Sequence, residues 1–283
     1  GVQTCALPIS LKTGPLMRCP AVSPDTLPPP PAARTGWPWT LGAYQPPDAD
    51  GRTSSPKPRV SIVMPSLNQG AYLEEAIRSV LQQNYGNLEL IVIDGGSSDG
   101  SADVLRRYDG RLTMWLCEPD GGPADALNKG FRFASGDILG FLSADDLLLP
   151  GCLDTMAAAF ARRPDADVIS GHGYLADRSG RERTPIYSDR WDLKRLVHTA
   201  CVLVQPATFF RREAFARVGA FGRTTRTAWD MELWADLAVA GASFHRIDAF
   251  LAVARLHEQS ISGCAGLRAQ RLADARRSEE HTS

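Results

Sequence analysis

Residues 88–101 read LELIVIDGGSSDGS, a largely apolar run that contains Glu89, ends at Asp94 and passes into a turn of glycine and serine. A short apolar run bounded by turn residues is typical of a strand that is buried on both faces. The following residues, 101–108 (SADVLRRY), have helical periodicity, and Ser101 is placed to cap the helix. The stretch therefore predicts a buried strand, a tight turn and a helix.

The same alternation of strand and helix recurs along most of the chain. The alternation predicts strands over 60–67, 112–119, 137–146 and 166–177 and helices over 70–85, 123–134 and 150–164, then helices over 188–199 and 227–242 and one or two strands over 243–257. This order indicates an α/β fold with a Rossmann-like, mostly parallel sheet flanked by helices. Ligands of such sheets bind outside the carboxyl ends of the strands, where Asp94, Asp145 and Asp146 fall.

Composition limits the class of protein. The chain has 283 residues, of which 43% are hydrophobic, enough for the core of one large domain. A formal net charge of −1 provides no general attraction for nucleic acid, so no nucleic-acid partner is expected. The six cysteines form no CxxC pair, which favours a reduced, cytosolic chain without a zinc site, and no apolar run is long enough to span a bilayer.

The chain ends differ from the middle in origin and composition. Residues 1–10 (GVQTCALPIS) and 277–283 resemble translated sequencing adapter, so we expect them to be non-native and the natural C-terminus to be missing. Residues 11–58 are rich in proline and are interpreted as an extended, flexible leader. A single catalytic domain is expected over residues 59–276.

Several motifs in a fixed order resemble those of family 2 glycosyltransferases, which have the GT-A fold. The motifs lie between Arg59 and about Ser262 and read SIVMPSLNQGAYLEEAIRSVLQQNY, IDGGSSDGS, EPDGGPADALNKGF, FLSADD, QPATFFRREAFARVGAF, WDMELWADLA and RLHEQSIS. The resemblance implies an inverting enzyme that moves a sugar from a UDP-, GDP- or dTDP-sugar to a hydroxyl of a saccharide or lipid-linked acceptor. It also implies a cytoplasmic role in cell-surface polysaccharide or glycoconjugate synthesis, with peripheral association at the inner face of the membrane.

The acidic doublet in FLSADD fits the metal motif of that family. A departing nucleoside diphosphate carries negative charge, which Mn²⁺ or Mg²⁺ neutralises while one or two carboxylates hold the cation. We expect Asp146 to bind the metal and Asp145 to contact the donor ribose or sugar, or the metal through water. His257 resembles a late histidine that reaches the metal or diphosphate. The family often has a further acid where Ser143 or Ala144 stands, so only the second half of the motif is present. The alternative is a doublet that starts a helix, because acids are favoured at helix starts.

The donor pocket is expected to use residues from three motifs. Pro65 and Ser66 end the first strand and would line the pocket through backbone groups. The resemblance makes Asp94 a contact to the nucleotide base or ribose, although a simple Asp-Gly turn is the alternative. Asn128 and Lys129 are placed at the pocket floor, where the lysine could offset diphosphate charge or only face solvent.

Inversion requires a base that removes the proton of the acceptor hydroxyl, and Asp230 in TAWDMELW is the candidate. Trp229 replaces the acid that commonly precedes this aspartate in the family. The alternative is an acid that only stabilises the start of a helix. Other functions remain open, namely a non-catalytic nucleotide-sugar-binding module or inactive fragment, and an oxidoreductase. The last needs G-x-G-x-x-G after the first strand, which PSLNQGAYLE lacks.

Overall fold

A computed structural model describes residues 27–40, 57–181, 183–192, 195, 201–222, 227–261 and 263. The two segments that resemble adapter sequence, and much of the helix expected over 188–199, lie outside the described residues. Within the described ranges, no helix combines the length and the apolar character needed to cross a membrane.

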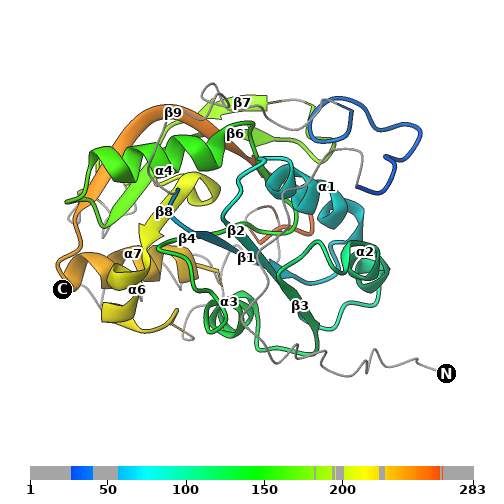
Figure 1. Cartoon of the computed structure of the whole chain (residues 1–283), viewed down its shortest axis with the longest axis horizontal. Helices are drawn as coiled ribbons and strands as arrows, with labels where there is room; N and C mark the ends of the chain where they lie inside the picture. The colour runs from blue at the N-terminus through cyan, green and yellow to red at the C-terminus, as the bar shows by residue number, and fades with distance from the viewer. Residues whose placement is uncertain are drawn as a thin grey trace.

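The N-terminal half of the domain alternates strand and helix as the sequence predicts (Figure 1). Its elements are β1 (Val60–Ser66), α1 (Gly70–Leu81), β2 (Leu88–Asp94), α2 (Ser101–Tyr108), β3 (Met114–Cys117), α3 (Pro123–Phe131) and β4 (Ile138–Phe141). The described elements of the C-terminal half are β5 (Leu147–Leu148), α4 (Cys152–Arg162), β6 (Val168–Ala176), β7 (Arg183–Ile186), η2 (Gln205–Ala207), β8 (Thr208–Arg211), α6 (Arg212–Val218), α7 (Trp229–Val239) and β9 (Phe244–Arg255).

The described strands form one nine-stranded sheet in the order β3-β2-β1-β4-β8-β6-β9-β5, with β7 paired to β6. The first four strands in this order are parallel, and Ser66 lies opposite Asp94, which in turn lies opposite Cys117. Strand β8 runs antiparallel to β4 and β6, whereas β9 runs parallel to β6 and antiparallel to β5. The carboxyl ends of β1–β4 therefore meet at one edge of the sheet.

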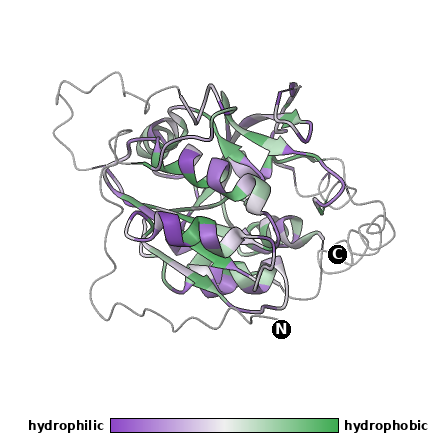
Figure 2. Cartoon of the chain, turned by 90° about the vertical axis from the view of Figure 1, so that its right-hand side faces the viewer, coloured by the Kyte–Doolittle hydropathy of each residue, from purple (hydrophilic) through white to green (hydrophobic). Residues whose placement is uncertain are grey.

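Two hydrophobic layers cover the sheet because successive side chains of a strand point to opposite faces. Ile62 and Met64 of β1 pack in the layer that contains α1, α2 and α4, whereas Val63 packs in the layer that contains α3, α6 and α7. In Figure 2 hydrophobic residues concentrate in the strands, and hydrophilic residues lie on the outward faces of the helices. Both faces of the sheet are thus covered, as expected for an α/β domain.

Part of the proline-rich leader is packed rather than extended. Leu27 and Trp39 are buried, Trp37 Nε1 donates to the Leu148 carbonyl at 2.9 Å, and Gln82 Nε2 donates to the Pro38 carbonyl at 2.6 Å. We call residues 27–40 the N-terminal strap; it is the blue loop beside α1 in Figure 1. The expectation of a flexible leader is wrong for these residues, because tryptophan side chains bury large apolar areas that outweigh the effect of proline-rich composition.

The turn between β2 and α2 differs from the expected serine cap. Gly100, with φ +92°, occupies the capping position, and Ser101 is the first helical residue. Asp99 accepts hydrogen bonds from the Ser101 N–H at 3.1 Å and the Gly70 N–H at 2.8 Å. Although burial opposes it, these bonds and one from the Ser101 hydroxyl lower the pKa of Asp99. Asp99 thus joins the starts of α1 and α2.

Candidate active site

Asp94 lies at the centre of a hydrogen-bonded turn where β1, β2 and β3 end. Its Oδ1 accepts from the N–H groups of Gly96 at 3.2 Å and Ser97 at 2.8 Å and from Cys117 Sγ at 3.3 Å. Its Oδ2 accepts from Ser66 Oγ at 3.0 Å and Ser97 Oγ at 2.7 Å. The carboxylate is fully buried and holds three strand ends together. The structure therefore brings Ser66 and Asp94 into contact, and their role toward a nucleotide stays a prediction.

The acidic doublet follows β4 and is tied to the end of β1, because the Ala144 N–H donates to the Pro65 carbonyl at 3.3 Å. Both carboxylates are buried, with 8% exposure at Asp145 and 7% at Asp146. The doublet leads directly into β5, and α4 begins only at Cys152. The alternative interpretation of the doublet as the start of a helix is therefore wrong.

One oxygen of each carboxylate in the doublet is held by the C-terminal part of the chain. Asp146 Oδ1 accepts from the Arg255 N–H at 2.8 Å, and Asp145 Oδ2 lies 3.0 Å from His257 Nε2. Burial and the neighbouring charge of Asp145 raise the pKa of Asp146, whereas the N–H and the charge of Arg255 oppose the rise. Two buried carboxylates side by side repel each other, so the site favours an added positive charge.

His257 lies against the doublet but has no unused ring nitrogen. The Gln259 N–H donates to His257 Nδ1 at 3.3 Å, which assigns the proton to Nε2, so that Nε2 donates to Asp145. The ring also packs on Tyr72, with ring centres 4.7 Å apart. In this arrangement His257 orients Asp145. Its predicted role as a metal ligand would require this hydrogen bond to break, and it stays a prediction.

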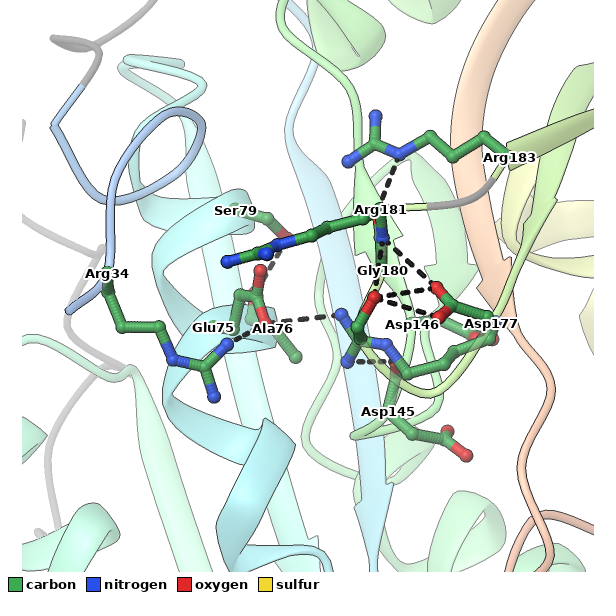
Figure 3. Close-up of polar contacts among 12 residues, drawn as sticks. Arg34, Glu75, Ala76, Ser79, Asp145, Asp146, Asp177, Gly180, Arg181 and Arg183 are labelled. Carbon is green, nitrogen blue, oxygen red and sulfur yellow. Dashed lines mark hydrogen bonds and ion pairs between the residues drawn. The ribbon is translucent and has the colours of Figure 1, made fainter.

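Arg255 and Glu75 belong to this site, although neither was predicted from the sequence. The Arg255 guanidinium donates to the Asp145 carbonyl at 2.9 Å and pairs with Glu75 at 3.1 Å. Figure 3 shows Arg34 and Glu75 on one side of the network and Asp145 and Asp146 on the other. Two signals could have identified them: an acid within the apolar stripe of the helix at 70–81, and an arginine two residues before His257.

The doublet fits a hard divalent cation that is completed by substrate. Among the described residues, no group of three or more histidine, cysteine or acidic side chains converges on one point. Asp145 Oδ1 and Asp146 Oδ2 accept no hydrogen bond from the described part of the chain. Two carboxylates with one uncommitted oxygen each match Mg²⁺ or Mn²⁺ sites, which take one or two carboxylates and obtain the remaining ligands from phosphates and water.

Asn128 is occupied by a contact within the protein. Its amide donates to the Phe221 carbonyl at 3.0 Å and accepts from the Phe221 N–H at 2.8 Å. It also lines a cavity of about 430 Å³ with Phe131 of α3, Phe215 of α6 and residues 219–221 that follow α6, and this cavity does not include the doublet. The structure thus gives Asn128 the role of fixing the chain between α6 and α7, and a direct contact to the donor stays a prediction.

Lys129 pairs with acids of its own neighbourhood. Its ammonium lies 3.0 Å from Glu118 and 3.6 Å from Asp125. The adjacent Asp120 leans over Gly95, where an added Cβ would come within 2.8 Å of its carboxylate. Burial raises the pKa of Asp120. Lys129 therefore stabilises the turn that leans on the β2 loop, and its predicted contact to the diphosphate remains a prediction.

Asp230 is half-buried in the first turn of α7. Burial raises the pKa of its carboxyl group, and the backbone N–H groups of Met231 and of Asp230 itself oppose the rise. The preceding Trp229 packs on Phe141 of β4, with ring centres 5.3 Å apart, so the start of α7 lies beside the strand that leads to the doublet. No contact within the described residues joins Asp230 itself to Asp146.

The fold and the doublet define the class as an α/β domain with an acidic, cation-compatible site at the carboxyl edge of its sheet. Residues 61–219 match the family model for glycosyl transferase family 2. The chain therefore belongs to glycosyl transferase family 2, as the motifs predict.

Relatives and solved structures agree with this membership. An uncharacterized glycosyltransferase of Rickettsia conorii is 30% identical over 72% of this chain and 35% of its own length. A PGL/p-HBAD biosynthesis glycosyltransferase of Mycobacterium bovis is 31% identical over 62% of this chain and 69% of its own. The chain thus spans about a third of the Rickettsia relative.

Two solved structures confirm the predicted GT-A fold. S. aureus TarS 1–349 in complex with UDP-GlcNAc has a TM-score of 0.60 at 19% identity, covering 73% of this chain and 61% of its own. A mannosyltransferase from Pyrobaculum calidifontis in complex with GDP-Man and Mn²⁺ has a TM-score of 0.59 at 21% identity, covering 78% and 64%. At such identities the likeness concerns the fold.

Proposed function

We propose that this chain is an inverting glycosyltransferase that moves a sugar from a nucleoside-diphosphate sugar to an acceptor hydroxyl, with Mn²⁺ or Mg²⁺ as cofactor. The observation that carries the proposal is the buried doublet at the carboxyl edge of the sheet. Asp145 and Asp146 each keep one uncommitted oxygen there, beside the turn that Asp94 organises. Family membership and two structural neighbours that hold nucleotide sugars support the donor class.

On the donor side, Asp145 and Asp146 would hold the cation. When bound, the cation neutralises the charge of the departing diphosphate. Asp94 and Ser66 keep the ends of β1 and β2 together, so that the backbone of this turn can receive the nucleoside. The candidate nucleotides are UDP, GDP and dTDP; neighbours that hold UDP-GlcNAc and GDP-Man support the first two.

On the acceptor side, Asp230 is the proposed base. Its raised pKa increases its affinity for the proton of the acceptor hydroxyl as that oxygen attacks the anomeric carbon. A carboxylate near this carbon also stabilises positive charge that develops on the sugar. The acceptor is proposed to be a saccharide or a lipid-linked molecule in polysaccharide or glycoconjugate synthesis. The Mycobacterium bovis relative, named for PGL/p-HBAD biosynthesis, supports this setting. We propose a cytoplasmic location, with peripheral association at the inner face of the membrane.

A thermal-shift screen tests the proposal. The protein is heated with UDP-, GDP- and dTDP-sugars, each with and without Mn²⁺. A ligand at about 100 times its Kd stabilises the native state by about 2.7 kcal/mol, so one donor class should raise Tm only when Mn²⁺ is present. Release of the nucleoside diphosphate during incubation would then distinguish an enzyme from a non-catalytic binding module. No Mn²⁺-dependent shift with any donor would contradict the proposal.

A further inference from the structure

Arg255 has a buried, positively charged side chain and contacts both residues of the acidic doublet. Its side chain is 1% exposed and lies where β9 ends. The guanidinium donates to the Asp145 carbonyl at 2.9 Å, and the backbone N–H of Arg255 donates to Asp146 Oδ1 at 2.8 Å. One residue therefore restrains the backbone of the first acid and the carboxylate of the second.

Glu75 of α1 fixes the position of that guanidinium. The two side chains lie 3.1 Å apart, and Glu75 is buried with 8% exposure. A buried arginine without a paired acid would be strongly destabilising, so the ion pair maintains the charge at this place. The planar fork of arginine bonds Glu75 through one nitrogen and Asp145 through the other, which a lysine ammonium on a flexible stem does not reproduce.

A second set of contacts, through Tyr72 and His257, also restrains the doublet. The ring of Tyr72, one turn before Glu75 on α1, lies 4.8 Å from the Arg255 guanidinium and 4.7 Å from the His257 ring. His257 then donates to Asp145 Oδ2 at 3.0 Å. Both the backbone and the carboxylate of Asp145 are thus held by residues that pack on one face of α1.

Further residues pack against both members of the Arg255–Glu75 ion pair. Arg34 of the N-terminal strap lies 3.7 Å from Glu75. Gly180, with φ +73°, brings the β6–β7 turn so close that an added Cβ would lie 2.9 Å from the Arg255 guanidinium. Arg255 therefore has little room to move away from the doublet.

We propose that Arg255, held by Glu75, is a positioning residue that keeps Asp145 and Asp146 in the arrangement that binds the divalent cation. The identity of the bound cation rests on the proposed function, whereas the restraint on the doublet does not. Residues that support metal ligands typically change metal affinity by 10- to 100-fold when altered, so substitution here should weaken Mn²⁺ binding without removing a ligand.

The test compares Arg255→Lys with Arg211→Lys. Arg211 also donates to main-chain carbonyls, those of Ala166 and Phe160, and it lies opposite Ile138, at the end of β4 away from the doublet. Free Mn²⁺ is measured by electron paramagnetic resonance, with UDP or GDP present and with Mn²⁺ alone. Arg255→Lys should weaken Mn²⁺ binding by about tenfold or more, and Arg211→Lys should leave it unchanged. Saturating Mn²⁺ should restore most of the turnover of Arg255→Lys.

Hydrogen exchange of the peptide that spans residues 142–149 provides a readout independent of metal. The proposal predicts faster exchange in Arg255→Lys than in Arg211→Lys. Equal exchange and equal Mn²⁺ affinity in the two variants would overturn it. If the unaltered protein binds no Mn²⁺, the proposed function fails, and the exchange comparison alone decides the positioning role. If Arg255→Lys does not fold, Glu75→Gln, which keeps an acceptor oxygen, replaces it in both measurements.

Discussion

The acidic doublet and Asp230 differ in how the chain holds them. Asp145 and Asp146 accept hydrogen bonds from His257 and Arg255, which lie more than a hundred residues later in the sequence. Asp230 is half-buried at the start of a helix and is stabilised by N–H groups of that same helix. The contrast matches two chemical tasks, because a cation ligand must keep its oxygens in place, whereas a base needs a raised pKa and access to substrate.

Substitution Asp230→Asn should have the largest effect on turnover. The amide cannot take the acceptor proton, so kcat should fall by about 10²- to 10⁴-fold, the usual contribution of general-base catalysis. Donor binding should persist, because the Mn²⁺-dependent rise in Tm depends on the doublet. If the variant lost donor binding together with sugar transfer, the proposed division of roles between Asp230 and the doublet would be contradicted.

The pH dependence of the unaltered protein sharpens this point. The base acts only when deprotonated, so turnover should fall as the pH is lowered through the raised pKa of Asp230. A carboxyl group whose pKa is higher in the folded state lowers stability as the pH rises through that range. Asp230→Asn should therefore unfold at a higher temperature than the unaltered protein above this pKa, which calorimetry at two pH values would measure.

Substitution Asp146→Asn should affect the other half of the comparison. It removes the negative charge of the proposed direct ligand, so the stabilisation of about 2.7 kcal/mol expected at a donor concentration of about 100 times Kd should disappear in the presence of Mn²⁺. Calorimetric titration of nucleoside diphosphate with and without Mn²⁺ measures the loss. Asp167→Asn is the control, because Asp167 lies before the amino end of β6, away from the doublet, and bonds Ser243 and Arg217. Unchanged Mn²⁺-dependent binding in Asp146→Asn would contradict the proposed role of the doublet in holding the cation.

The N-terminal strap adds a smaller, structural test. Trp39 is buried under Arg34 and Arg78, so Trp39→Ala should lower the free energy of unfolding by about 3 kcal/mol. Because Arg34 contacts Glu75, the variant should also weaken Mn²⁺-dependent donor binding. The pH at which turnover falls in acid, which depends on Asp230, should not change. Trp115→Ala, on β3, is the control for stability loss alone. If Trp39→Ala and Trp115→Ala changed donor binding equally, the expected coupling between the strap and the doublet would be contradicted.

Asp99→Ala should give the smallest effect. Loss of its bonds to the Gly70 and Ser101 N–H groups should lower the free energy of unfolding by about 1 kcal/mol at neutral pH. The pKa of Asp99 is lowered in the folded state, so its contribution is present above the unfolded pKa and is lost as the pH falls through the folded one. The free energies of unfolding of the two proteins, measured with urea, should therefore become equal in acid. A difference that stays constant at all pH values would contradict this explanation.

The sequence predicted well those features that depend on neighbouring residues. The apolar run before Asp94 and the helical stripe over 70–81 are local signals, and the strands and helices of the N-terminal half follow them closely. The doublet at a strand end was found for the same reason. The relation of Asp94 to Ser66 also followed, because parallel strands place their carboxyl ends together.

Contacts between distant residues could not be predicted in this way. The bond from Arg255 to the Asp145 carbonyl joins positions 110 residues apart and requires β5 to pair with β9. Asn128 offers no local sign of its contact with Phe221. In the strap, proline-rich composition pointed to an extended leader, although the tryptophans that pack there were visible in the sequence.

A crystal structure of the protein with Mn²⁺ and the nucleoside diphosphate that raises its Tm would test the central claim most directly. Anomalous scattering locates manganese without reference to the protein chemistry around it. The account predicts one peak in contact with the carboxylates of Asp145 and Asp146 and with the diphosphate, on the same side of the sheet edge as Asp230. A nucleotide bound with manganese elsewhere, or with the doublet turned away from it, would contradict the account.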